Sequence, residues 1–278
     1  MKVGAILLGA TLATTLACSG AKAGLIDLNG YIGPVQFKFQ NYESFTGNTI
    51  TPGAMDFGVV KVTSIVNPVT GTNLWVQGQG GQFLAAVFNG ITVNTVTPTS
   101  SGFVTTNTGG TFQLWLDSAD FDPTQGTSGY MTGGCSTVGS LCYNGITNTG
   151  GIDLVDFNLV PGTTSDPTNT LNATVSTTTL PTSGSAEGFA DITGGADASE
   201  FGRGDFTTLF APADLHFLND FCGNGQPGCV GPTSSDWQLF SHDPLDAVVV
   251  PEPASLALLG TALLGFGSLA RRRIRLRK

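Results

Sequence analysis

Short apolar runs alternate with polar residues along most of the chain, and clusters of Gly, Asn, Thr and Ser separate them. In the first clear case, Val35, Phe37 and Phe39 alternate with Gln36 and Lys38. A period of two places such side chains on one face of a strand. Comparable runs predict further strands at residues 57–66, 73–77, 82–88, 91–96, 111–116, 152–160, 171–178, 188–192, 237–240 and 247–250.

Turn signals lie between these runs, for example Asn89-Gly90, Gly109-Gly110 and Gly194-Gly195. Many short strands at this spacing are typical of an all-β fold, and we predict a β-sandwich or jelly roll. Residues 211–218 have a modest helical pattern. Residues 161–185 are rich in Thr, Ser and Pro, which predicts a long exposed loop.

The N-terminus has the pattern of a secretory signal peptide. Lys2 gives a positive start, and an apolar run follows over residues 3–17. The cleavage site is formed by Ala21, Ala23 and Gly24. We therefore predict a signal peptide over residues 1–23, followed by an extracellular body over residues 24–249. Cys18 supports a second interpretation, because the residues before it partly match a lipoprotein box in which the cysteine carries a lipid.

Residues 250–278 combine three features in order: a Pro-Glu-Pro tripeptide, an uncharged apolar run at 254–270 and an arginine cluster. As a helix this run spans about 26 Å, just enough to cross a thin hydrocarbon layer. The basic cluster favours the cytoplasmic side, so the run is predicted to be a transmembrane helix that leaves the body outside. The residues of this signal are Val250, Pro251, Glu252, Pro253, Arg271, Arg272 and Arg273.

This C-terminal segment resembles the PEP-CTERM sorting signal of Gram-negative bacteria that make exopolysaccharide. The resemblance covers only the end of the chain. It implies an inner-membrane precursor, recognition by an exosortase, cleavage near the motif, and delivery to the cell surface or extracellular matrix. The sequence of residues 74–114 is similar in general character to that of flocculation-associated proteins with this signal. A plain single-span anchor is the alternative interpretation of the tail.

Four cysteines remain after the leader, in two pairs with equal spacing: Cys135 with Cys142, and Cys222 with Cys229. An exported chain meets oxidising conditions, so we predict two local disulfides. Pairing between the two loops is a second possibility. A zinc site built from the four thiolates is a third interpretation, although zinc ligands usually lie two to four residues apart.

Charge is distributed unevenly along the chain. The body keeps only Lys38, Lys61 and Arg203 as basic residues and holds every acidic residue except Glu252. Such a surface repels nucleic acid and anionic lipid headgroups, which excludes nucleic acid as a partner. It can attract divalent cations or keep the body soluble.

One acidic group has the spacing of a candidate cation site. Asp117, Asp120 and Asp122 fall in a short segment before a turn, and carboxylates in such loops can hold Ca²⁺. The spacing does not match an EF-hand, and a solvated acidic loop is the alternative. Apart from this Ca²⁺ candidate, the sequence implies no cofactor.

The sequence contains no nucleophile elbow, metalloprotease helix, phosphate loop or dinucleotide fingerprint. Arg203-Gly204-Asp205 matches an adhesion tripeptide that is common by chance, and we assign it no role. We therefore predict a non-enzymatic surface or matrix protein that acts in adhesion, flocculation or biofilm. A module that binds polysaccharide, Ca²⁺ or ice is one alternative. A secreted hydrolase that uses paired Asp and Glu residues is the other.

Overall fold

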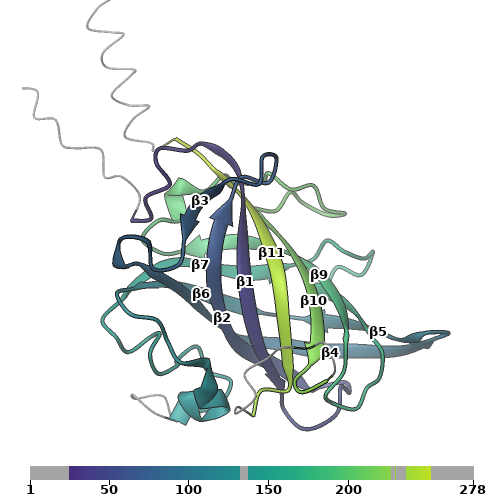
Figure 1. The fold of residues 1–278 in the computed structure, drawn as a ribbon. Helices are drawn as coiled ribbons and strands as arrows, with labels where there is room; N and C mark the ends of the chain where they lie inside the picture. The colour runs from purple at the N-terminus through teal and green to yellow at the C-terminus, as the bar shows by residue number, and fades with distance from the viewer. Residues whose placement is uncertain (1–24, 132–136, 227–228, 230–235, 252–278) are drawn as a thin grey trace, which may run out of the picture. The chain divides into compact units, whose positions relative to one another are not determined.

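The computed structural model describes residues 25–131, 137–226, 229 and 236–251, which lie within one unit spanning residues 23–253 (Figure 1). Their strands form one antiparallel sheet with the order β3-β2-β1-β11-β10-β9-β7-β6-β4-β5-β8. The strands are β1 (Gly33–Phe45), β2 (Met55–Val66), β3 (Asn73–Val76), β4 (Phe83–Thr99), β5 (Gly102–Thr108), β6 (Thr111–Asp117), β7 (Ile152–Val160), β8 (Leu171–Val175), β9 (Gly184–Gly194), β10 (Leu215–Gly223) and β11 (Leu239–Val249). The described connections also contain the short 3-10 helices η1 (Gln79–Gly81), η2 (Pro123–Met131) and η3 (Ala198–Glu200).

The sheet closes on itself, because β2 pairs with β1 along one edge and with β4 along the other. One side of the wall is built at two levels. The first part of β4, residues 83–89, pairs with β6, and its second part, residues 92–99, pairs with β5. β9 divides in the same way, since residues 184–188 pair with β8 and residues 189–194 pair with β7. The pair β6 and β7 therefore fills the wall at one level, and β5 and β8 fill it at the other.

Alternate side chains of these strands point into the enclosed space and form the main hydrophobic core. Phe112 of β6 is stacked between two other rings, with centroids 5.0 Å from Phe88 and 4.8 Å from Phe157. Burying one such side chain stabilises the fold by about 1.5–3 kcal/mol. The alternation seen in the sequence thus provides an inner lining for a single closed sheet.

A second apolar cluster covers the outer face of β1, β2 and β4. The connection between β6 and β7 contains η2 and brings Tyr130 and Tyr143 edge to face, with ring centroids 5.1 Å apart. Two polar groups of the cluster have partners within the protein: Tyr130 Oη donates to the carbonyl of Gly58, and Trp237 Nε1 donates to the carbonyl of Pro123. β2 is consequently packed on both faces.

The prediction of an all-β fold is confirmed, but the predicted packing of two sheets is not, because the eleven strands belong to one sheet. Residues 82–88 and 91–96 were expected to be separate strands joined by a turn, and they form the single strand β4. Gly90 has a φ of +77° and lies where β4 changes partner from β6 to β5. Only glycine adopts such a φ without strain, so the turn signal marks a bend within one strand.

Two smaller predictions are also wrong. Residues 211–218 are not helical, because β10 begins at Leu215 with alternating buried and more exposed positions. The predicted loop at 161–185 contains β8, whose side chains Leu171, Ala173 and Val175 enter the core. β8 lies within the run at residues 171–178 that the sequence also predicts to be a strand.

Several predicted features lie outside the described residues. These are the signal peptide at 1–23 with Ala21, Ala23 and Gly24, the transmembrane helix at 254–270, Glu252, Pro253, Arg271, Arg272, Arg273 and Cys135. In the described part of the chain, no helix has the length and apolar character needed to cross a membrane. Cys222 and Cys229 form the predicted local disulfide, with Cα atoms 5.8 Å apart.

Candidate functional site

The inward side of β1 changes from apolar to polar along the strand. Val35, Phe37 and Phe39 belong to the core, whereas the next two positions of the same face are Asn41 and Glu43. Both are buried, with 2% and 4% of their surface exposed. A carboxyl group in an apolar interior is costly unless it is protonated, hydrogen-bonded or paired with a positive charge. This end of the enclosed space is therefore the candidate site.

A second buried carboxyl lies close to the first. The register of β1 and β2 pairs Glu43 with Gly58 and Phe45 with Asp56, so Asp56 is a diagonal neighbour of Glu43. Gly58 is required at its position, because a Cβ atom there would lie 2.7 Å from Cε1 of Phe88. The glycine thus allows the Phe88 ring to pack beside the two acids.

Two amides hold the carboxylate of Glu43. Asn219 lies on β10 between the core residues Phe217 and Phe221, and its Nδ2 donates to Oε1 of Glu43 at 3.1 Å. Nδ2 of Asn41 donates to the same oxygen. Residues far apart in the sequence therefore converge on one carboxylate, and both amides turn their nitrogen toward it.

The pKa values of the two acids reflect their burial. Desolvation raises the pKa of Glu43 to about 7, against the opposing effect of the hydrogen bonds from Asn219 and Asn41. Desolvation and the neighbouring charge of Glu43 raise the pKa of Asp56 well above its usual value. Two ionised carboxylates cannot share this interior cheaply, so the pair retains protons unless a cation compensates them.

The acids border an internal cavity of ≈ 40 Å³. Its polar lining consists of Asn41, Glu43, Asp56, Thr105, Asn107 and Asn219. A water molecule occupies about 30 Å³ in the liquid, and pockets for drug-sized ligands start at about 300 Å³. The cavity therefore has room for a water molecule or a metal ion, and a sugar or a lipid does not fit.

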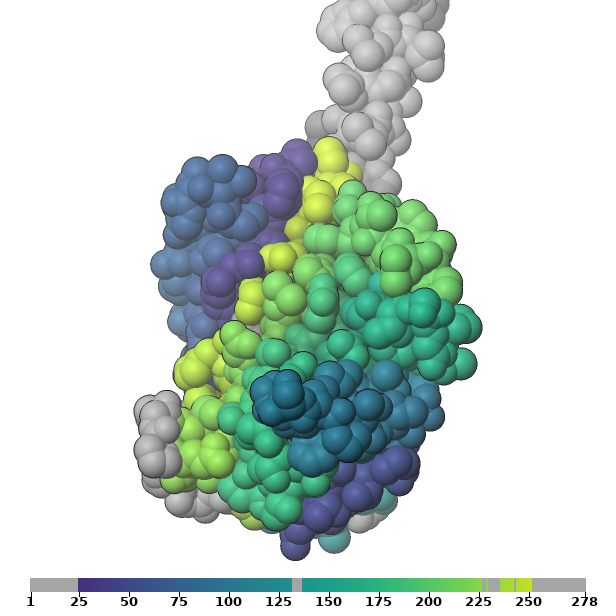
Figure 2. All heavy atoms as spheres, turned by 90° about the vertical axis from the view of Figure 1, so that its right-hand side faces the viewer, coloured from purple at the N-terminus to yellow at the C-terminus, as the bar shows by residue number. Residues whose placement is uncertain are grey.

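A separate groove lies on the outer face of the same wall. Two rows of side chains cross β8, β9 and β10 there, with one residue from each strand in each row. The rows are Asn172-Glu187-Leu218 and Thr174-Ser185-Asp220. With His242 and Pro244 of β11, they line an open groove of ≈ 430 Å³. Figure 2 shows this side of the unit, with β9 and β10 in green beside β11 in yellow.

The wall between groove and cavity has an interrupted hydrogen-bond ladder. β10 pairs with β11 at Phe217–Leu245 and again at Phe221–Ser241, and the described sheet has no pairing between residues 218–220 and 242–244. Pro244 contributes to this gap, because proline has no N–H to donate. Asn219 lies inside the gap and lines both the groove and the cavity. The groove and the buried acids therefore meet at one residue.

The predicted Ca²⁺ candidates have separate partners. Asp120 forms an ion pair with Lys61, and Asp122 accepts hydrogen bonds from the backbone and side chain of Thr124, which lower its pKa. Asp117 accepts from the hydroxyl of Thr149. Across the described residues, no cluster of three or more His, Cys, Asp or Glu side chains is placed to hold a metal ion.

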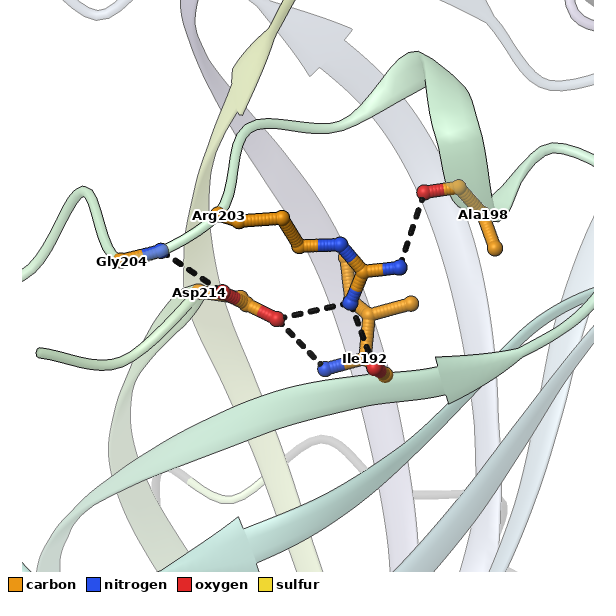
Figure 3. Close-up of polar contacts among 5 residues, drawn as sticks. All are labelled: Ile192, Ala198, Arg203, Gly204 and Asp214. Atoms are coloured by element: carbon orange, nitrogen blue, oxygen red, sulfur yellow. Dashed lines mark hydrogen bonds and ion pairs between the residues drawn. The ribbon is translucent and has the colours of Figure 1, made fainter.

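Arg203 of the adhesion-like tripeptide is engaged within the protein (Figure 3). Its Nη1 donates to Oδ2 of the buried Asp214 at 2.8 Å and to the carbonyl of Ile192, and its Nη2 donates to the carbonyl of Ala198 at 3.3 Å. The backbone N–H of Gly204 donates to Oδ1 of Asp214 at 2.7 Å. The tripeptide thus anchors a loop to β9 and β10.

The sequence analysis missed Glu43, Asp56 and Asn219. A signal was present in β1, because Glu43 continues the period of two that starts with Val35. A charged residue on the apolar face of a strand indicates a buried polar group. Nothing local in the sequence connects β1 with β10, so the meeting of Glu43 with Asn219 needs the fold.

The fold and the site define an all-β protein whose single closed sheet surrounds a small cavity bordered by buried acids and amides. At its C-terminal end the body leads directly into the sorting segment: Val250 follows β11, and its N–H donates to the carbonyl of Glu200 at 2.8 Å. The family of the PEP-CTERM protein-sorting motif matches residues 249–273. The chain thus carries a PEP-CTERM sorting motif, which implies an exported protein that is directed to the cell surface and processed by an exosortase. No curated protein and no solved structure matches the chain.

Proposed function

We propose that the sorted body is a non-enzymatic surface or matrix protein that binds polysaccharide through its outer groove and thereby supports adhesion, flocculation or biofilm. The observation that supports this proposal is the arrangement of the two rows of side chains that cross β8, β9 and β10 in the outer groove. Neighbouring strands lie about 4.8 Å apart, so each row offers hydrogen-bonding groups at regular intervals. An extended chain of sugar hydroxyls suits such an array.

The groove has both kinds of contact that a saccharide uses. Asn172, Thr174 and Ser185 supply donors and acceptors, and Leu218 and Pro244 supply apolar surface. Nε2 of His216 lies 3.0 Å from Oε1 of Glu187, which fixes the position of this carboxylate at the groove. The volume of ≈ 430 Å³ lies in the range of ordinary ligand sites.

The hydrolase hypothesis is less well supported by the geometry. A carboxyl with a raised pKa can act as a general acid, and Glu43 and Asp56 have this property. A glycosidase must place the sugar between its two carboxyl groups. The cavity of ≈ 40 Å³ beside Glu43 and Asp56 is too small for a sugar ring.

Removing polar groups from the groove should weaken polysaccharide binding. We expect the double variant Asn172→Ala/Thr174→Val to bind exopolysaccharide oligosaccharides of the producing cells about tenfold or more weakly, since two hydrogen bonds of about 1 kcal/mol are lost. Isothermal titration calorimetry on the full chain measures this change. Asn94→Ala/Thr97→Val is the matched control, because both residues are exposed on β4 away from the groove. Equal affinities for the two variants, or no binding by the unmodified protein, would refute the proposal.

Disrupting the sorting motif should hold the protein in the inner membrane. In the native host we expect Pro251→Ala/Glu252→Ala/Pro253→Ala to accumulate as an uncleaved precursor, while the unmodified body is released with a C-terminus near the motif. An extended proline-flanked segment is accessible to a protease, whereas alanines permit a helix. Fractionation followed by mass spectrometry distinguishes the two forms. Glu187→Gln should be sorted normally, and normal release of the motif variant would contradict processing at this site.

A further inference from the structure

The interior cavity contains buried oxygen atoms that lack a donor. Oδ1 of Asn41, Oδ1 of Asn219 and Oδ1 of Asp56 have no hydrogen-bond partner among the described residues. These three residues are at least nine-tenths buried and line the same cavity. An unsatisfied buried acceptor costs about 1–3 kcal/mol, so three in one cavity indicate a missing electropositive group.

The charges of the residues that line the cavity also indicate that a positive group is missing. The residues that line the cavity include two carboxyls, Glu43 and Asp56, and no Lys, Arg or His. Both amides of the site turn Nδ2 to Glu43, so their carbonyl oxygens remain for another partner. The lining therefore offers oxygen ligands and negative charge at one point.

We propose that this cavity binds one hard divalent cation of the Ca²⁺ class between Glu43 and Asp56, with the amide oxygens of Asn41 and Asn219 as further ligands. Carboxylate and amide oxygens are the ligands that Ca²⁺ prefers, and a divalent ion balances two carboxylates. The volume of ≈ 40 Å³ accommodates an ion with a water molecule. The site is separate from the outer groove, and its existence does not depend on polysaccharide binding.

The interrupted ladder between β10 and β11 provides the route to the cavity. Residues 218–220 and 242–244 are not joined by ladder hydrogen bonds, and the side chain of Asn219 lies between groove and cavity. Segments of neighbouring strands that share no ladder hydrogen bonds separate at a lower cost in free energy than paired segments do. A cation enters there from the acidic outer face and meets its proposed ligand Asn219 first.

The experiment uses the full chain in detergent, freed of metal by EDTA and titrated with CaCl₂ in a calorimeter. We expect one saturable site, and at about one hundred times its Kd we expect Tm to rise by about 5–10 °C. Glu43→Gln/Asp56→Asn should abolish the saturable site and the shift. Asp120→Asn/Asp122→Asn removes the same number of charges at the surface and should keep both.

If the double variant does not fold, crystals of the unmodified chain grown with Ca²⁺ decide the question. An anomalous peak between Glu43 and Asp56 supports the site. Water alone in the cavity, a peak only near Asp120 and Asp122, or the same loss of binding in the surface variant would overturn it. Absence of saturable Ca²⁺ binding by the unmodified chain would do the same.

Discussion

Raising the pH from 5 to 8 in the presence of a chelator should lower the free energy of unfolding by several kilocalories per mole. The folded protein keeps a proton on Glu43 up to a pKa of about 7, because burial disfavours its charged form, whereas the unfolded chain releases it near the ordinary pKa of 4.5. Between these two values the folded state binds more protons, so stability falls as the pH rises. A pKa unit corresponds to about 1.4 kcal/mol, and Asp56 shifts in the same direction.

Urea unfolding curves at several pH values measure this loss, and Glu43→Gln isolates its source. Glutamine keeps the oxygen that accepts from Asn41 and Asn219 and has no charge to bury. The other titratable group that interacts with Asp56 is Tyr130 on the outer face, and burial raises the pKa of this tyrosine beyond the range of the experiment. Glu43→Gln should therefore reduce the slope of the pH profile between pH 5 and 8 and leave the part that the burial of Asp56 contributes.

The control for this experiment is Glu187→Gln, which removes an exposed carboxylate of the same type from the acidic surface. It should leave the slope almost unchanged. If the unmodified protein and Glu43→Gln lost stability equally, Glu43 would not be the source of the pH dependence. With saturating Ca²⁺ in place of chelator, the cation site predicts a smaller loss at high pH, because the ion binds the ionised acids.

The alternating pattern predicted the class of fold well where the inner face is apolar. The strand predicted at residues 57–66 lies inside β2, and the strand predicted at 152–160 coincides with β7, because both strands have apolar inward positions. β5 was missed because its inward residues include Thr105 and Asn107, which line the cavity and break the apolar pattern. The same applies to β10, where Asn219 interrupts the apolar residues. Polar residues of the site thus hid β5 and β10, whereas β1 and β2 were predicted from their apolar positions.

Closure of the sheet could not be predicted from local pattern. An alternating pattern indicates that one face of a strand is buried. It does not indicate what covers that face, which can be a second sheet or the opposite side of the same closed sheet. The decisive contact is the pairing of β2 with β4, which lie next to β1 and β6 respectively. The candidate Ca²⁺ acids were visible because they are close in sequence, whereas Glu43 and Asn219 are 176 positions apart.

Replacing Asp214 should destabilise the protein by about 3 kcal/mol, because three hydrogen bonds to a buried carboxylate are lost. Oδ2 of Asp214 accepts from the N–H of Ile192 at 2.9 Å and from Arg203, and Oδ1 accepts from the N–H of Gly204. In Asp214→Ala these donors lose their acceptor in a site where the aspartate is only 7% exposed. Urea unfolding of the full chain in detergent gives the change in free energy.

The variant Arg203→Ala tests whether the ion pair or the backbone hydrogen bonds of Asp214 account for this loss of stability. The side chain of Arg203 is 49% exposed, so solvent screens its charge, and its removal leaves Asp214 with two backbone donors. We expect a loss of only about 1 kcal/mol for this variant. The loop between β9 and β10 should also be cleaved faster by protease in Asp214→Ala than in Arg203→Ala. Equal losses in the two variants would mean that the ion pair, rather than the backbone donors held by Asp214, fixes the loop.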